Sequence, residues 1–208
     1  VELIKRKIKV IFCDEKHSPC SELLPCYGHG ESSGKLREQI QWDTDFCRLL
    51  WAEIVAEKIR NQALFLAEKK MNRESEMLME YVQNIQSGDL SNREGHAAKV
   101  YFNKIFGNTF RRGDGSLILS AFNREIVACG YSTQLGITHH NTFNHFNLSC
   151  DLMEPFRILI DRWVDSCRFL QFGTKEKHRM LEIFNQPFFI DGTQRRLDDC
   201  VLMYVRSI

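Results

Sequence analysis

A long amphipathic pattern near the middle of the chain constrains the fold more than any other feature. Between Trp42 and Lys70, apolar residues recur at intervals of three or four positions. The members of this stripe are Phe46, Leu49, Leu50, Ile54, Val55, Ile59 and Ala63. Such spacing places the apolar side chains on one face of an α-helix. The sequence therefore predicts one long helix that packs against other parts of the protein.

Helical patterns recur through the rest of the chain. A second helix is expected over Met77–Ile85, closed by Ser87 and Gly88. Further helical patterns cover about 93–107, 117–130, 151–168, 174–185 and 194–206. The chain has no internal repeat and no low-complexity tract, so we expect a mainly α fold, with a compact helical domain over residues 34–208.

The first 33 residues have a different character. Lys7–Cys13 has the β-branched and aromatic content of a strand and ends at a turn-rich segment, Asp14–Ser21. A lone strand leaves its backbone groups unpaired, so we expect β structure that precedes Val1 to complete a sheet. Gly28–Gly34 has the composition of a linker. Residues 1–33 are therefore predicted to be the end of a β domain and the linker to the helical domain.

Composition excludes several classes of protein. The chain of 208 residues is 43% hydrophobic, which suits a globular protein, and no apolar run approaches a membrane span. Its eight cysteines form no CxxC pair, so we expect reduced thiols and a bacterial cytoplasmic location. The net charge is +1, but residues 93–208 carry 15 Lys and Arg against 12 Asp and Glu. If several of those acids bind metal, this part presents a more positive surface.

Glu94 is the first candidate for chemistry. It falls on the same helical face as an apolar set, which consists of Ala97, Ala98, Tyr101 and Ile105. A carboxylate on an apolar face needs a partner. The alternative is structural, because Ser91 and Glu94 have the spacing of a capping box, in which Glu94 would accept from the Ser91 backbone amide.

A denser cluster occupies Gly136–Arg157, with three histidines, three asparagines and two carboxylates. Asp151 and Glu154 are three residues apart, so both would project from one side of a first helical turn if Asp151 opens the helix. The alternative is simple N-capping, with Pro155 just inside the helix. His139 or His140, taken singly, is more often a hydrogen-bonded loop histidine than a metal ligand.

One imidazole nitrogen with two or three carboxylate oxygens suits Mg²⁺ or Mn²⁺. Such a centre serves phosphoryl transfer, because the ion stabilises the attacking and leaving oxygens. Covalent catalysis is less well supported, since Ser149 and Cys150 lie in no nucleophile elbow or triad motif.

Several motifs, in order along the chain, resemble those of one family. They are Asn92–Asn103 with Phe106-Gly107, Asn123–Val127, Leu135–Ile137, His139–Asn141, Phe146–Leu148 and Asp151–Arg157. Together they closely resemble the CRISPR-associated spacer-acquisition integrases in their type II form, and the segment that begins at Lys9 resembles the end of that family's β domain. The family usually has a complete β-sandwich domain first, most of which is absent before Val1. It also carries a longer segment where this chain has Arg111–Ser116.

The resemblance implies a metal-dependent DNA endonuclease and integrase. The 3′-hydroxyl of a captured DNA fragment, the prespacer, attacks a phosphodiester at the edge of the CRISPR repeat in a direct transesterification. By motif position the catalytic metal ligands are Glu94, His139 and Glu154, with Asp151 as an accessory acid. His139 is preferred to His140 because it follows Gly136-Ile-Thr directly.

The resemblance also implies partners. The family acts as a homodimer with the small second CRISPR-adaptation protein (Cas-two), and type II systems can add further adaptation proteins; no membrane is involved. Basic residues beside the proposed ligands are expected to hold DNA phosphates, and these are Arg93, Lys99, Arg111, Arg112 and Arg157.

Two other functions remain open on the sequence. One is a non-catalytic DNA-binding or scaffold subunit, in which the acids only cap helices. The other is a structural zinc site, whose candidate ligands are Cys13, His17, Cys20, Cys26 and His29, although this spacing matches no common zinc finger. The tryptophans fall on helical apolar stripes and are expected in the core; they are Trp42, Trp51 and Trp163.

Overall fold

The structure is a computed structural model that describes residues 1–6, 10–13, 19–23, 32–107, 116–167, 181–185, 188–190 and 193–208. Helices dominate these residues, and the strands among them are short and form two-stranded sheets. The prediction of a mainly α fold is confirmed. None of the helices in the described residues is both long enough and apolar enough to cross a membrane.

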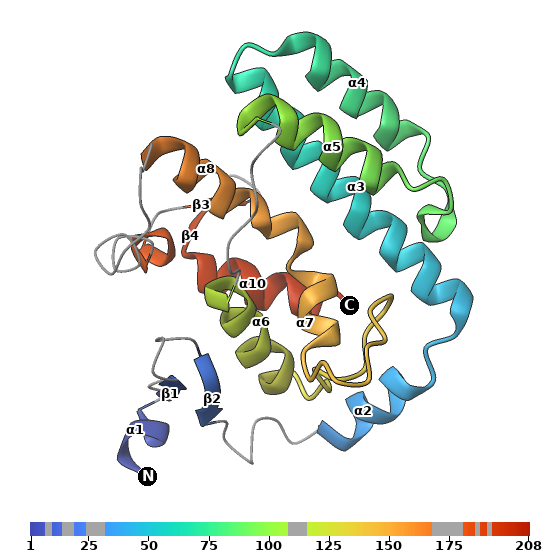
Figure 1. The fold of residues 1–208 in the computed structure, drawn as a ribbon. Coiled ribbons are helices and arrows are strands. Elements are labelled where there is room, and N and C mark those ends of the chain that lie inside the picture. Colours follow the sequence, from blue (N-terminus) through green and yellow to red (C-terminus); the bar gives the residue numbers. More distant parts are fainter. Residues whose placement is uncertain are drawn as a thin grey trace.

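The long helix α3 (Thr44–Glu68) is the centre of the fold, as Figure 1 shows. It begins at Asp43, whose carboxylate accepts a hydrogen bond of 2.7 Å from the Phe46 backbone amide. Helices α4 (Asn72–Gln83) and α5 (Arg93–Ile105) pack along it. The short α7 (Asn147–Leu152), the 3₁₀ turn η2 (Glu154–Phe156) and α8 (Arg157–Cys167) also contact it.

These contacts explain why α3 is buried on more than the one predicted face. Ala56 and Phe65 lie outside the predicted stripe and are buried, whereas Phe46 and Leu49, near the start of the helix, are exposed. The expectation of a one-sided amphipathic helix is therefore wrong in detail. A helix with neighbours on several sides buries apolar side chains around most of its circumference.

The core continues into a second group of helices, α6 (Ser116–Ala128) and α10 (Leu197–Arg206), which pack together. An aromatic cluster joins them to η2: the rings of Phe122 and Phe156 have centroids 5.2 Å apart, and those of Phe156 and Tyr204 are 5.3 Å apart. The three tryptophans lie as expected, since Trp51 and Trp163 are buried and Trp42 packs against the core.

The N-terminal segment holds a short helix α1 (Glu2–Lys5) and a hairpin of β1 (Val10–Cys13) with β2 (Pro19–Leu23). The antiparallel pairing of β1 with β2 corrects the expectation that this strand has no partner within the chain. Helix α2 (Ser32–Ile40) begins inside the predicted linker. The remaining residues of that linker lie outside the described residues.

The predicted helix over 151–168 is three elements, and Pro155 supplies the reason. In a continuous helix the proline ring would clash with the carbonyl of residue 151. Helix α7 therefore ends at Leu152, and Pro155 lies in η2 before α8 begins. Asp151 consequently lies near the end of a helix, not at the start of one as expected.

Two further predictions near the C-terminus need correction. The part of the predicted 174–185 helix that the structure describes is a 3₁₀ helix, η3 (Leu181–Asn185). The predicted helix over 194–206 begins as strand β4 (Thr193–Arg195), which pairs with β3 (Phe188–Ile190), and only then continues as α10.

Candidate metal centre

Two glutamates from separate elements meet at one lysine of the central helix. Glu94 comes from the first turn of α5 and Glu154 from η2. The Lys58 ammonium, from the middle of α3, lies 2.5 Å from Glu94 Oε1 and 2.5 Å from Glu154 Oε2. The Lys58 side chain is only 9% exposed and that of Glu154 is 7% exposed. The structure thus brings together two of the three predicted ligands around a cation.

The start of α5 is capped without Glu94. The turn η1 (Ser87–Asp89) ends at Asp89, whose carboxylate accepts from the backbone amides of Arg93 and Glu94 at 2.8 and 2.9 Å. Asn92, in the left-handed region at φ 52°, accepts from the Gly95 amide. The capping-box alternative for Ser91 and Glu94 is therefore wrong, and the Glu94 carboxylate remains available for Lys58.

Glu154 is held from both sides. Its second oxygen, Oε1, forms an ion pair with Arg157 Nη1 at 3.1 Å, while Lys58 binds the first. The turn that carries it is tied to α3, because the Asn61 side chain donates to the Pro155 carbonyl at 3.2 Å. Arg157 was expected to hold a DNA phosphate; in the structure it pairs with the Glu154 carboxylate three residues before it.

His139 lies in the loop before α7, and Asp151 fixes its position. The completely buried Asp151 carboxylate accepts from the backbone amides of Ile137 (2.6 Å), Thr138 (3.1 Å) and His139 (3.3 Å). Its Oδ1 also bonds the His139 Nδ1 at 2.6 Å. Asp151 was expected as an accessory acid; in the structure its oxygens face donors from the His139 loop, so it orients the imidazole and leaves Nε2 as the free ring nitrogen.

The electrostatics of His139 agree with this arrangement. The hydrogen bond to Asp151 is the largest cause that raises the pKa of His139, and the charges of Asp151, Glu154 and Glu94 act in the same direction. The ring system of Trp51 on α3 lies nearly perpendicular to the imidazole, with centroids 6.2 Å apart.

Gly136 permits the tight loop that holds His139. A Cβ at this position would lie 2.3 Å from the His139 carbonyl oxygen and 2.9 Å from Asp151 Oδ2. Only glycine allows the backbone to approach itself this closely here. The Gly136-Ile-Thr-His139 spacing is therefore a structural requirement of the loop.

The donor set fits a divalent cation at the position of the Lys58 ammonium. Within the described residues, no three His, Cys, Asp or Glu side chains converge as a ready metal site. Instead, an ammonium ion stands between two carboxylates that are already turned toward a cation. Two carboxylates and one imidazole nitrogen match the preferences of Mg²⁺ and Mn²⁺. Glu94, Glu154 and His139 would hold such an ion once Lys58 has moved aside.

Sequence reasoning missed Lys58, although a signal was present. Lys58 follows Ile54 by four residues and Val55 by three, so it lies on the apolar stripe of α3 itself. A lysine on a buried face needs an acidic partner. The same logic that singled out Glu94 would have paired the two residues.

The remaining residues that the sequence analysis considered as ligands or DNA contacts are not part of the Lys58 cluster or lie outside the described residues. His140 is exposed and lines a smaller hollow together with Trp42. The Arg93 guanidinium stacks over the Tyr81 ring at 5.4 Å, and Lys99 is exposed on α5. Arg111 and Arg112 lie outside the described residues.

Half of the cysteines have side chains that the structure describes. Those whose side chains the structure describes are free thiols, and they are Cys47, Cys129, Cys150 and Cys200. The zinc alternative falls on residues whose side chains lie outside the described part of the chain.

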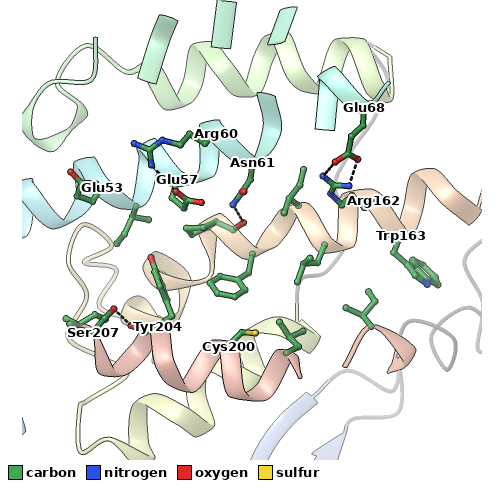
Figure 2. A pocket seen from close by; sticks show the side chains of 18 of the residues that line it. Glu53, Glu57, Arg60, Asn61, Glu68, Arg162, Trp163, Cys200, Tyr204 and Ser207 are labelled. Carbon is green, nitrogen blue, oxygen red and sulfur yellow. Dashed lines mark hydrogen bonds and ion pairs between the residues drawn. The ribbon is translucent and has the colours of Figure 1, made fainter. Parts of the chain in front are cut away.

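A larger cavity of about 1330 Å³ opens between α3, α8 and α10 (Figure 2). Its acidic residues are largely neutralised: Glu57 pairs with Arg60 at 2.9 Å, and Glu68 pairs with both terminal nitrogens of Arg162. No histidine is among the described residues that line it. We therefore place the candidate centre at the Lys58 cluster, where two carboxylates meet one cation.

The fold and the cluster define a mainly helical protein in which a lysine of the central helix pairs with two glutamates from separate elements, and a buried aspartate orients a nearby histidine. Comparison with known proteins agrees with the resemblance seen in the sequence. The chain matches the family of the CRISPR associated protein Cas1 over residues 1–114 and 115–171, and it belongs to that family.

A curated relative extends this result. The chain is 32% identical over 163 residues to the CRISPR-associated endonuclease Cas1 of Neisseria meningitidis serogroup C (strain 8013). The match covers 73% of this chain and 54% of that protein, so the chain spans about half the length of the curated relative.

Solved structures share the fold. A CAS1 protein from Thermotoga maritima has a TM-score of 0.74 at 16% identity, over 99% of this chain and 78% of that one. A partial Cas6-RT-Cas1–Cas2 complex gives 0.72 at 17% identity, over 98% and 77%. A casposase bound to an integration product gives 0.67 at 16% identity, over 99% and 75%.

Proposed function

We propose that this chain is the catalytic part of a CRISPR-adaptation integrase, which inserts captured DNA fragments into the CRISPR array. The observation that carries the proposal is the cluster in which Lys58 joins Glu94 to Glu154 beside His139. Membership of the Cas1 family supports it, as does the endonuclease name of the Neisseria relative.

The reaction is a transesterification. The 3′-hydroxyl of the captured fragment gives up its proton as its oxygen forms a bond to a repeat-edge phosphorus. The phosphorus–oxygen bond of the repeat breaks, and the departing oxygen takes up a proton as a new 3′-hydroxyl. A bound Mg²⁺ or Mn²⁺ would stabilise the negative charge that develops on the phosphate oxygens.

The protein groups hold and orient this centre. Glu94, Glu154 and His139 Nε2 would provide the ligands, and Asp151 fixes the imidazole through Nδ1. Arg157 offsets the charge of Glu154, which reduces the repulsion that the carboxylates exert on an approaching phosphodiester. Arg93 and Lys99 on α5, with Arg111 and Arg112, are proposed to hold flanking phosphates in a salt-dependent manner.

The proposal includes an assembly, because a captured fragment has two ends to join and each chain supplies one such centre. We propose a homodimer that works with a Cas2 protein and, in a type II system, with further adaptation proteins. The fold similarity to a chain of a Cas6-RT-Cas1–Cas2 complex supports the choice of Cas2 as partner.

A strand-transfer assay tests the proposal. The full-length protein and its Cas2 partner are incubated with a fragment that has free 3′-hydroxyls and a labelled repeat DNA, with Mn²⁺ or with a chelator. We expect metal-dependent joining that falls by about 100-fold or more in Glu94→Gln and Glu154→Gln. Glu53→Gln, an exposed glutamate of α3 outside the cluster, is the matched control and should stay active. Full activity of Glu154→Gln with Mn²⁺ would overturn the assignment.

A further inference from the structure

We propose that Lys58 is the resident cation of this centre in the metal-free protein, and that a divalent ion binds only by displacing its ammonium group. The inference rests on the proposed function, since it concerns the same two glutamates. It assigns to Lys58 a role that neither the sequence motifs nor the ligand set contains.

The geometry gives the ammonium and a metal ion the same position. Lys58 Nζ contacts one oxygen of Glu94 and one of Glu154, each at 2.5 Å. These carboxylates come from α5 and η2, which are far apart in the sequence, so they converge on a single point beside α3. An ion that bridges the same two oxygens would overlap with Nζ, and the two positive charges would repel each other.

Burial explains why the metal-free protein needs a cation there. Two carboxylates turned toward one poorly solvated position repel each other. Lys58, with 9% of its side chain exposed, offsets this repulsion and contacts an oxygen of each carboxylate. The ligands are then already oriented when an ion arrives, and the long lysine side chain has the rotational freedom to withdraw.

The same arrangement weakens the affinity for metal. The incoming ion must break two charge-assisted hydrogen bonds before it gains its ligands. Removal of the ammonium should therefore tighten metal binding while it destabilises the metal-free protein. If Lys58 served only to stabilise the fold through its two ion pairs, its removal would not tighten metal binding.

Isothermal titration of the full chain with Mn²⁺, without DNA, tests the inference. For Lys58→Met, which keeps the length of the side chain and removes its charge, we expect Mn²⁺ affinity to rise roughly tenfold. Lys58→Arg keeps the charge and should show no such gain. Lys69→Met is the matched control, because Lys69 ends the same helix and pairs with a different carboxylate, that of Asp165; its Mn²⁺ affinity should equal that of the unaltered protein.

A second measurement needs no variant. Acylation of lysines, followed by mass spectrometry, should label Lys58 slowly in the metal-free protein and faster when Mn²⁺ is present. Lys69 should react at the same rate in both conditions.

The outcomes separate the inference from the proposed function. Suppose that Glu94→Gln weakens Mn²⁺ binding, that Lys58→Met does not tighten it, and that Mn²⁺ does not change the labelling rate of Lys58. The proposed displacement of Lys58 is then overturned, whereas the metal centre is retained. If Glu94→Gln and Glu154→Gln both bind Mn²⁺ as the unaltered protein does, the assignment of the metal centre is wrong, and the role proposed for Lys58 is wrong as well.

Discussion

Replacement of Asp151 by asparagine tests whether this acid positions the His139 loop or acts mainly as an accessory ligand. Both carboxylate oxygens face N–H donors from Ile137, Thr138 and His139. An asparagine has one oxygen and one NH₂ group, so in either orientation its NH₂ group must face at least one of these donors. The side chain is completely buried, and water cannot replace the lost acceptor.

The expected loss follows from these contacts. A charge-assisted hydrogen bond contributes about 1.5–3 kcal/mol, and a buried donor left unpaired costs about 1–3 kcal/mol. Because the asparagine oxygen retains part of the network, we expect a loss of about 3 kcal/mol in the free energy of unfolding. For a chain of 208 residues this lowers Tm by roughly 6–12 °C.

Urea unfolding of the metal-free protein measures this loss. Asp165→Asn is the matched control: this carboxylate is partly exposed, pairs with Lys69, and should contribute less than about 1 kcal/mol. If Asp151→Asn were as stable as the control without metal and lost stability only relative to the Mn²⁺-bound protein, Asp151 would be a ligand and the positioning role would be refuted.

Three further predictions concern Gly136, His139 and Cys200. Gly136→Ala should lower the free energy of unfolding by about 1–3 kcal/mol, because its Cβ meets the His139 carbonyl; Gly34→Ala, with open space around it, should not. An NMR titration of the metal-free protein should give a pKa for His139 above 6.5, which Asp151→Asn lowers. The stability from this pair is then complete below about pH 6.5 and lost as the pH rises through the raised pKa. Burial raises the pKa of Cys200, so the pH profile of its alkylation by iodoacetamide should have a midpoint above 9.0, and a midpoint at or below that value would contradict the burial.

The sequence predicted the local elements well, because they depend on local patterns. The periodicity of α3 gave nearly its full length, and the buried face of α5 carries Ala97 and Tyr101 as expected. The same reasoning recognised Glu94 as a carboxylate that needs a partner. Helices that are interrupted were less predictable. Pro155 was expected in the first turn of a helix, but it lies in η2, which separates α7 from α8.

The sequence could not predict the partnerships between distant residues. Lys58 lies 36 positions from Glu94 and 96 from Glu154, and no local spacing joins them. The position of Asp151 depends on a loop that folds back onto α7 through Gly136. These contacts arise from tertiary packing around α3, so no short motif predicts them when it is considered by itself.

The position of the metal ion is the most direct test of the account. Crystals of the protein grown with Mn²⁺, and measured where manganese scatters anomalously, would locate it. The account predicts one peak within coordination distance of Glu94, Glu154 and His139 Nε2, with the Lys58 ammonium withdrawn from both carboxylates. A peak elsewhere, or no peak with Lys58 still between the two glutamates at saturating Mn²⁺, would contradict it.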